Sequence, residues 1–289
     1  MHATISKALK TTLLASAAAL TVAGAAQAAS LEEIQESGSI RIAVANEIPY
    51  GYIDPVSGEA MGAGPDVAKH IVEELGVTDI EWITTDFSSL IPGLQADRFD
   101  MVAAEMAIIP TRCATVIYSE PNTSYGEGLL VASGNPDGLS GYQDFADNSD
   151  LKVAIMAGAN QLDMMQALGV SEDQLVTISS NADAISTVST GRANAYAATG
   201  LTASELAGQS DAVEVAEGFS DPVIDGTEQR SWGGFVFAQG NEGLRDAVNE
   251  VLAEYKQTDE WLASVSGYGF TDADTSRSFD MSTEELCTE

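Results

Sequence analysis

Short apolar runs alternate with amphipathic stretches in the first half of the chain. The β-rich runs Ile40 to Val44, Ile80 to Ile83 and Phe99 to Ala104 predict strands. Between the first two runs, apolar residues recur at helical spacing from Pro65 onward, and Gly76 ends that pattern. Strands that alternate with helices predict a mainly parallel sheet, with binding loops at the carboxyl ends of its strands.

Glycine-rich apolar segments interrupt this alternation twice and predict two crossings between lobes. The first is Tyr125 to Ala132, and the second is Gln229 to Phe237. Between them, the strand-like run Lys152 to Ile155 and the helix-opening turn Gly158 to Gln161 belong to a second α/β unit. About 260 mature residues exceed the usual size of a single core. We therefore predict an α/β protein with a hinge, in which residues 29–124 and 233–289 form a discontinuous first lobe and residues 125–232 form the second. The crossings are expected near 124–128 and 229–233.

The amino-terminal segment has the pattern of an export signal. Lys7 and Lys10 precede a Leu- and Ala-rich run, and Ala26-Gln27-Ala28 supplies an A-x-A cleavage motif. The run is too short and too poor in large side chains for a membrane span. Cleavage after Ala28 leaves no cysteine at the cut that would accept a lipid. We therefore expect residues 1–28 to be removed and the mature protein to be free and soluble in a bacterial periplasm.

The composition is strongly acidic. The formal charge is −32 at pH 7, and removal of the two lysines of the leader would make it −34. Nucleic acid and anionic membrane surfaces are poor partners for such a chain, because phosphate binding needs clustered Lys and Arg. The charge favours cationic or zwitterionic cargo, although solubility, for example in a salty habitat, explains it more simply. We expect a monomer without a cofactor.

Cys113 and Cys287 are the two cysteines of the chain, an even number in an oxidising compartment. A disulfide between them would fasten the carboxyl-terminal tail beside Arg112. By the loop-entropy model, so long a loop would stabilise the fold by about 5 kcal/mol before any strain is subtracted. Two buried thiols are the alternative, and we expect the disulfide.

A short segment after the third predicted strand carries the most informative basic residue. Arg112 is one of ten Lys and Arg residues outside the leader. At the exit of a buried strand it is placed to meet a small anion, and its guanidinium suits a two-point grip on a carboxylate. An ion pair with an acid of its own lobe is the alternative. Glu47, Tyr50 and Phe87 also follow predicted strands, so they should converge near the same edge of the sheet. Backbone N–H groups of Gly158 to Gln161 should face them from the second lobe.

Five segments between Ser39 and the carboxyl terminus carry a further pattern. They are Gly64-Pro65-Asp66-Val67-Ala68, Asp86-Phe87-Ser88-Ser89-Leu90-Ile91-Pro92-Gly93-Leu94, Pro110-Thr111-Arg112, Gly128-Leu129-Leu130-Val131 and Gly191-Arg192-Ala193-Asn194-Ala195-Tyr196. In this order they resemble the amino-acid-type (family 3) solute-binding proteins of ABC importers. The resemblance implies the type II periplasmic binding protein fold, two α/β lobes around a ligand cleft, and delivery of a solute to a membrane permease.

Four segments indicate which subfamily the chain resembles most. They are Asn46-Glu47-Ile48-Pro49-Tyr50, Leu90-Ile91-Pro92-Gly93-Leu94-Gln95-Ala96, Arg112-Cys113 and Glu285-Leu286-Cys287. They are most similar to the ectoine- and hydroxyectoine-binding proteins. This implies that Glu47 pairs with the amidinium of the ligand, that the rings of Tyr50 and Phe87 stack on it, and that Arg112 takes its carboxylate. A cyclic delocalised cation would gain about 0.5–2 kcal/mol from each ring face by cation–π attraction.

Three expected ligand-binding residues depart from the pattern of these relatives. Ala107 stands where a third aromatic ring belongs, and it cannot stack. Glu105 replaces a small residue and would add an acceptor for a more basic ligand. Thr199 stands near the position where amino-acid-binding relatives carry an aspartate for the α-amino group. We therefore predict a carrier of ectoine or hydroxyectoine, with a polar or basic amino acid as the alternative ligand.

Several expected ligand-binding residues also have a plainer interpretation. Asn160 can cap its helix as well as line the cleft. Trp232, at the second crossing, either stacks on the ligand or packs at the hinge. Glu47 would otherwise be a solvated loop acid, Phe87 ordinary core and Tyr50 part of the rim.

Other function classes fit the sequence less well. A cyclohexadienyl-type dehydratase on the same scaffold would need a positioned acid, which Glu105 or Glu47 would supply. Outside the leader the chain has one histidine, His70, on the helix that begins near Pro65, so the sequence offers no further His for a Ser-His-Asp or Cys-His arrangement and no His and Cys cluster for a metal. An external sensor domain would require a transmembrane helix. We therefore predict a binding protein and not an enzyme.

Overall fold

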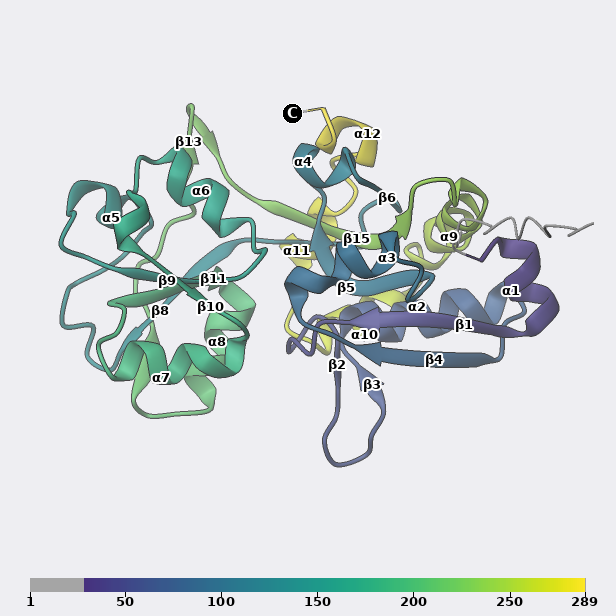
Figure 1. Ribbon diagram of the computed structural model, residues 1–289, viewed down its shortest axis with the longest axis horizontal. Coiled ribbons are helices and arrows are strands. Elements are labelled where there is room, and N and C mark those ends of the chain that lie inside the picture. Colours follow the sequence, from purple (N-terminus) through teal and green to yellow (C-terminus); the bar gives the residue numbers. More distant parts are fainter. Residues whose placement is uncertain (1–28, 289) are drawn as a thin grey trace, which may run out of the picture.

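The computed structural model describes residues 29–288, which form two lobes side by side (Figure 1). The expected leader, residues 1–28, and Glu289 lie outside the described residues. Each lobe is built on its own β-sheet, with helices packed around it. The predicted α/β fold with two lobes is confirmed.

The sheet of the first lobe combines strands from both halves of the chain. Its order is β4-β1-β5-β15-β6, and β7 also pairs with β15. The strands are β1 (Ser39–Val44), β4 (Asp79–Thr84), β5 (Met101–Ala107), β6 (Val116–Tyr118), β7 (Thr123–Tyr125) and β15 (Ser231–Ala238). β1 is parallel to β4 and β5, whereas β15 is antiparallel to β5, β6 and β7. The sheet is therefore mixed instead of mainly parallel, because β15 is the return of the chain and runs in the opposite direction.

Helix α2 (Ala63–Glu74) shows how the helices of this lobe are specified. Its buried side includes Val67, Ala68, Ile71 and Val72, the apolar positions at helical spacing. It begins two residues before Pro65, directly after Gly62, where a Cβ atom would lie 2.8 Å from the carbonyl carbon of Tyr50. The other helices of the lobe are α1 (Leu31–Ser37), η1 (Phe87–Ser89), α3 (Leu90–Gln95), α4 (Pro110–Cys113), α9 (Glu242–Tyr255), α10 (Asp259–Ser266), α11 (Asp272–Arg277) and α12 (Thr283–Leu286). The short hairpin of β2 (Tyr52–Ile53) and β3 (Ala60–Met61) projects from the same lobe.

The second lobe repeats the plan on a smaller scale. Its sheet has the order β10-β9-β11-β8-β12. The strands are β8 (Glu127–Ala132), β9 (Val153–Met156), β10 (Leu175–Ile178), β11 (Ala195–Thr199) and β12 (Val213–Val215), and the helices are α5 (Gln143–Asp147), α6 (Gln161–Ala167), η2 (Glu172–Gln174), η3 (Asn181–Asp183), α7 (Ala184–Ser189) and α8 (Gly200–Gly208). β9, β10 and β11 are parallel, and β8 runs against β11 and β12. A hairpin of β13 (Val223–Ile224) and β14 (Thr227–Glu228) precedes the return to the first lobe.

The chain crosses between the two sheets at two narrow points. β7 ends at Tyr125 and β8 begins at Glu127, which leaves Gly126 as the first crossing. A Cβ atom at Gly126 would lie 2.9 Å from Oδ2 of Asp221, whose Oδ1 accepts from the backbone N–H of Glu127 at 2.7 Å. The second crossing is next to Ser231, where β15 begins. The strands place Tyr125 and residues 231–232 in the first sheet, and not in the second lobe as the boundaries 125–232 expected, because β7 and β15 pair with each other up to the crossing.

Each lobe has its own apolar core, and one side chain reaches both. Ile42, Phe235 and Leu252 are buried in the first lobe, and Leu129 and Phe145 are buried in the second. Phe87, on the short 3-10 helix after β4, packs against clusters of both lobes. Between residues 29 and 288, the helices are all too short or too polar to cross a membrane.

Candidate functional site

A cavity lies where the two lobes meet. The first lobe supplies residues at the ends of β1, β4 and β5, and the second lobe supplies residues at the end of β11 and the start of α6. The parallel strands β1, β4 and β5 bring their carboxyl ends to one edge of the sheet, which is why side chains far apart in sequence meet there. Seven of the ten expected ligand-binding residues line the cavity: Glu47, Tyr50, Phe87, Glu105, Ala107, Asn160 and Thr199.

Arg112 and Gly158 lie beside this cavity, in an adjoining groove. The groove shares Phe87 and Asn160 with the cavity. The guanidinium is buried, with 7% of the residue exposed, and its carbon lies 5.4 Å from the centre of the Phe87 ring. One nitrogen donates to the carbonyl of Ala107 and another to the carbonyl of Gly158, each at 2.9 Å. Arg112 thus connects the lobes through backbone carbonyls, and within residues 29–288 it forms no ion pair with an acid.

Trp232 lies outside the cavity. Its indole Nε1 donates to the carbonyl of Arg277 at 2.9 Å, and its ring packs against an apolar cluster of the first lobe. Trp232 was expected either to stack on the ligand or to pack at the hinge, and in the structure it packs near the hinge.

Side chains that the sequence did not indicate complete the cavity wall. Tyr125, Met156, Gln161, Tyr196 and Thr202 are among them. Tyr125 was detectable as an aromatic residue directly before the crossing glycine. Tyr196 lies in the middle of β11, and only the register of that strand decides which of its side chains face the cavity.

Hydrogen bonds between side chains join the lobes around the cavity. The hydroxyl of Tyr50 donates to Oγ1 of Thr199 at 2.6 Å. Nδ2 of Asn181 donates to Oε1 of Glu47 at 2.9 Å, and the hydroxyl of Tyr196 donates to Oδ1 of Asn181. These bonds close one side of the cavity.

Asn160, at the start of α6, makes a further contact to the first residue of β15. Its Nδ2 donates to Oγ of Ser231 at 3.2 Å. The side chain makes no capping bond to α6. Asn160 thus lies at the N-cap position of α6, as expected, and its side chain bonds to the first lobe instead of to the helix.

Three buried carboxyl groups give the site its electrostatic character. Glu47 is 7% exposed, and burial raises the pKa of its carboxyl to about 7, against the opposing effects of the Asn181 hydrogen bond and the Arg112 charge. Glu105 is 2% exposed, and burial raises its pKa too. Glu127 lies next to the first crossing, where it accepts hydrogen bonds from Gln161 and Tyr142, and burial raises its pKa to about 7. A cation in the cavity would favour the ionised form of the acids beside it.

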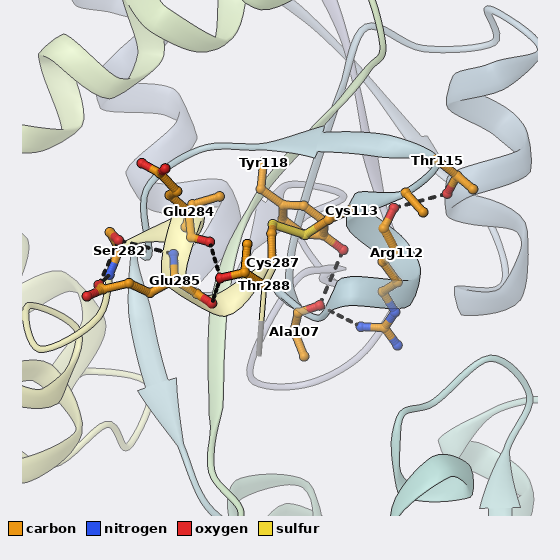
Figure 2. Close-up of a disulfide and its surroundings, with 12 residues drawn as sticks. Ala107, Arg112, Cys113, Thr115, Tyr118, Ser282, Glu284, Glu285, Cys287 and Thr288 are labelled. Atoms are coloured by element: carbon orange, nitrogen blue, oxygen red, sulfur yellow. Dashed lines mark hydrogen bonds between the residues drawn. A yellow bond between two sulfur atoms is a disulfide. The ribbon is translucent and has the colours of Figure 1, made fainter.

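The predicted disulfide between Cys113 and Cys287 is present and joins α4 to α12 (Figure 2). The two Cα atoms are 5.7 Å apart. Figure 2 shows that the carbonyl of Ala107 accepts from both the Arg112 guanidinium and the hydroxyl of Tyr118. The bridge therefore fastens the carboxyl-terminal tail to the one-turn helix that carries Arg112.

Sequence comparisons place the chain among transport proteins. The model of the bacterial extracellular solute-binding proteins, family 3, matches residues 40–270. A probable amino-acid ABC transporter periplasmic-binding protein, y4tE of Sinorhizobium fredii, is 54% identical over 276 residues, which cover 94% of this chain and 91% of the relative.

Solved structures agree with this placement. The crystal structure of EhuB in complex with hydroxyectoine is similar with a TM-score of 0.80 and 33% identity, over 89% of this chain and 97% of EhuB. An ancestral amino-acid-binding protein, described as a precursor of cyclohexadienyl dehydratase, has a TM-score of 0.72 and 27% identity, over 83% of this chain and 99% of its own. Both solved structures are of binding proteins, in line with the family description.

Proposed function

The chain belongs to the bacterial extracellular solute-binding proteins of family 3, and we propose that it binds ectoine or hydroxyectoine in the cavity between its lobes. In coarser terms it is a substrate-binding protein of an amino-acid-type ABC transporter and not an enzyme. Export by the segment 1–28 and work as a monomer in the periplasm are part of the proposal.

The proposal rests on two opposite charges, the carboxylate of Glu47 in the cavity and the guanidinium of Arg112 in the adjoining groove, which both lie beside Phe87. Glu47 is a buried carboxylate in the cavity, and Arg112 lies near enough for its charge to lower the pKa of Glu47. A small zwitterion fits such a pair because each of its charged groups meets the opposite charge. The Arg112 guanidinium donates to the carbonyls of Ala107 and Gly158. If the carboxylate of the ligand took the place of these carbonyls, the buried guanidinium would gain a charged partner.

The rings around the cavity favour a delocalised cation. Tyr50, Phe87, Tyr125 and Tyr196 line it, so the two additional tyrosines supply aromatic surface that Ala107 cannot. Cation–π attraction to such rings is worth about 0.5–2 kcal/mol each. The complex of the similar protein EhuB with hydroxyectoine supports the same class of ligand.

A polar or basic amino acid is the second candidate. The Sinorhizobium fredii relative is described as a probable amino-acid transport protein, and Glu105 adds a second carboxylate to the cavity wall. Against it, Thr199 offers a hydroxyl where amino-acid-binding relatives carry an acid, and that hydroxyl already accepts from Tyr50. A carboxylate at this place would hold an α-ammonium group better than a hydroxyl does.

We expect the ligand to dock on the first lobe through Arg112, Phe87 and Glu47. The second lobe then rotates inward with the segment from Gly158 to Gln161 and expels water. The ligand stabilises the closed form, which the membrane permease recognises.

A thermal-shift screen followed by calorimetry tests the proposal. The panel contains ectoine, hydroxyectoine, L-arginine, L-glutamine and L-cystine, with prephenate as a substrate control. We expect ectoine or hydroxyectoine to give the largest rise in melting temperature and the tightest binding. A response to amino acids alone would exclude the compatible solute in favour of the second candidate, and turnover of prephenate without tight binding would exclude the carrier.

A further inference from the structure

Glu105 is held from behind by residues that do not line the cavity. Nδ2 of Asn122 donates to Oε1 at 2.7 Å, and the hydroxyl of Thr123 donates to Oε2. Nε1 of Trp261 donates in turn to Oδ1 of Asn122 at 2.9 Å. A carboxylate offers about four acceptor positions, so this one keeps acceptor capacity for a ligand in the cavity.

The backbone around Glu105 leaves space made for its carboxylate. β15 passes beside it at Gly233, where a Cβ atom would lie 2.7 Å from Oε2 and 2.9 Å from the carbonyl oxygen of Glu105. The absence of a side chain at Gly233 therefore leaves the space that the Glu105 carboxylate occupies.

Lys256 lies behind the same network, near the end of α9. It is 8% exposed, and its Nζ donates to the carbonyl of Pro121 at 2.7 Å and to that of Ser278 at 3.0 Å. Nζ also lies 4.1 Å from the centre of the Phe279 ring. Because Pro121 directly precedes Asn122 and Thr123, the ammonium fixes the segment that supplies both donors to Glu105. Within the described part of the chain, Lys256 has no carboxylate within ion-pair distance.

Arg112 and Lys256 balance the two acids that line the cavity, Glu47 and Glu105, whereas Glu127 does not line it and accepts hydrogen bonds from Gln161 and Tyr142. Ionised Glu47 and Glu105 carry two negative charges, Arg112 carries one positive charge, and a bound zwitterion adds none. One buried carboxylate would then lack a counter-charge, which is costly in an interior of low dielectric constant. Lys256 is the buried cation that supplies it from the side away from the ligand.

We propose that Lys256 is a positioning residue that keeps Glu105 ionised, so that Glu105 joins Glu47 in accepting the N–H groups of the ligand's delocalised cation. The identity of the bound cation in this assignment rests on the proposed function. The effect of Lys256 on the ionisation of Glu105 does not depend on it. An amidinium or guanidinium suits two carboxylates because it presents N–H groups in different directions, whereas a simple ammonium concentrates its charge at one point.

The electrostatics of the network agree with this arrangement. Burial raises the pKa of Glu105, and the bonds from Thr123 and Asn122 and the charge of Lys256 lower it. Burial lowers the pKa of Lys256 to about 8, so the side chain remains mostly charged at pH 7. Tyr50 and Tyr125 are the other titratable groups that feel the charge of Glu105, and burial raises both pKa values well above 10.0, which leaves them neutral.

The test compares Lys256→Gln and Lys256→Met with the wild type. Both variants remove the charge, but the amide of glutamine can still donate to a backbone carbonyl. Affinity for ectoine is measured by calorimetry between pH 5.5 and pH 9, in the wild-type and Glu105→Gln backgrounds. We expect both variants to bind more weakly than the wild type, by at most about tenfold for each unit by which the pKa of Glu105 rises, with the largest difference at the acidic end of the range. At pH 9, where Lys256 is mostly neutral in the wild type as well, the affinities should converge.

The pH profile separates the charge from a structural role. A loss of the same size at every pH, or no loss at all, would overturn the proposal. A loss that persists in the Glu105→Gln background would overturn it too, because Lys256 would then act elsewhere.

A measurement without ligand keeps the proposal testable if ectoine does not bind. The side-chain carboxyl of Glu105 is followed by carbon NMR in ¹³C-labelled protein, with its resonance identified by its loss in Glu105→Gln. We expect it to titrate at higher pH in Lys256→Gln than in the wild type. An unchanged titration refutes the role of Lys256 whatever the ligand, whereas failure of ectoine to bind refutes only the proposed function.

Discussion

Proton release on binding is the sharpest consequence of the buried Glu47. The carboxyl has a pKa of about 7 in the cavity because burial disfavours its charged form. A ligand cation beside it favours that form, so binding should displace the proton. At pH 7 about half of the Glu47 carboxyls are protonated, and binding should release about half a proton for each ligand.

The affinity should follow the ionised fraction of Glu47. That fraction is about one half at pH 7, about one tenth at pH 6 and about one hundredth at pH 5. If the ligand binds the ionised form, its apparent affinity falls by about fivefold from pH 7 to pH 6 and by about a further tenfold to pH 5. Calorimetry of ectoine binding in phosphate and in Tris, whose ionisation enthalpies differ, measures both the affinity and the released protons.

The stability of the ligand-free protein should depend on pH in the opposite direction. A carboxyl whose folded-state pKa lies above its ordinary value stabilises the fold fully below the ordinary value, and that contribution is lost as pH rises through the folded-state pKa. For Glu47 the window runs from about 4.5 to about 7, and the contribution is of the order of 3 kcal/mol. Relative to Glu47→Gln, the ligand-free wild type should therefore lose stability across this window while it gains affinity.

Two variants isolate the effect of Glu47. Glu47→Gln should weaken binding at pH 8 by about 2–5 kcal/mol and should remove this part of the pH dependence. Glu59→Gln, at an exposed acid outside the cavity, is the matched control and should behave as the wild type. An affinity that stays constant from pH 5 to pH 8, with the same heat in both buffers, would show that Glu47 does not meet the cation.

Three further predictions concern other parts of the site. Arg112→Ala should weaken binding by at least about 2 kcal/mol, because a desolvated carboxylate loses its partner, whereas the exposed Arg192→Ala should leave the calorimetric affinity unchanged; equal affinities for both variants would contradict the role of Arg112. Replacement of Cys113 and Cys287 by serine should lower the free energy of unfolding by up to about 5 kcal/mol, since the bridge closes a loop with a sequence separation of 174. A denaturant titration that gives the same free energy of unfolding with and without the bridge would refute the loop-entropy argument. Gly233→Ala should destabilise the fold by about 1–3 kcal/mol and weaken binding, because its Cβ meets Glu105, while Gly243→Ala, with open space around its Cβ, should be neutral or slightly stabilising in thermal unfolding; identical melting temperatures would remove the argument from the close approach of β15.

The parts of the site that follow strands were predictable from the sequence. Glu47 and Phe87 each lie three residues after the end of a strand of the parallel set β1, β4 and β5, and a parallel sheet brings such residues to one edge. The direction of β15 was not predictable in this way, since a glycine-rich apolar run is compatible with either direction in the sheet. Pairing with β5, β6 and β7 decides it.

The contacts that cross from one lobe to the other could not be predicted from the sequence. The bond from Asn181 to Glu47 joins residues 134 positions apart, and it depends on how the lobes close. Arg112 was predicted to face the cleft, yet its guanidinium turns to the carbonyls of Ala107 and Gly158 beside the cavity. A one-turn helix fixes where its side chain starts, whereas the position of the charged end depends on acceptors in the other lobe.

The placement of the few positive charges connects the acidic composition to the site. Ten Lys and Arg residues lie outside the expected leader, and between residues 29 and 288 four of them, Arg41, Lys69, Arg230 and Arg245, form ion pairs with acids. Arg112 and Lys256 are the two that are buried among residues 29–288, and neither forms an ion pair there. Burying a cation without a partner is unfavourable unless a negative charge arrives or already lies near. For Lys256 the nearby negative charges are Glu105 and, to a smaller extent, Glu120, and for Arg112 it is the carboxylate that we expect the ligand to bring.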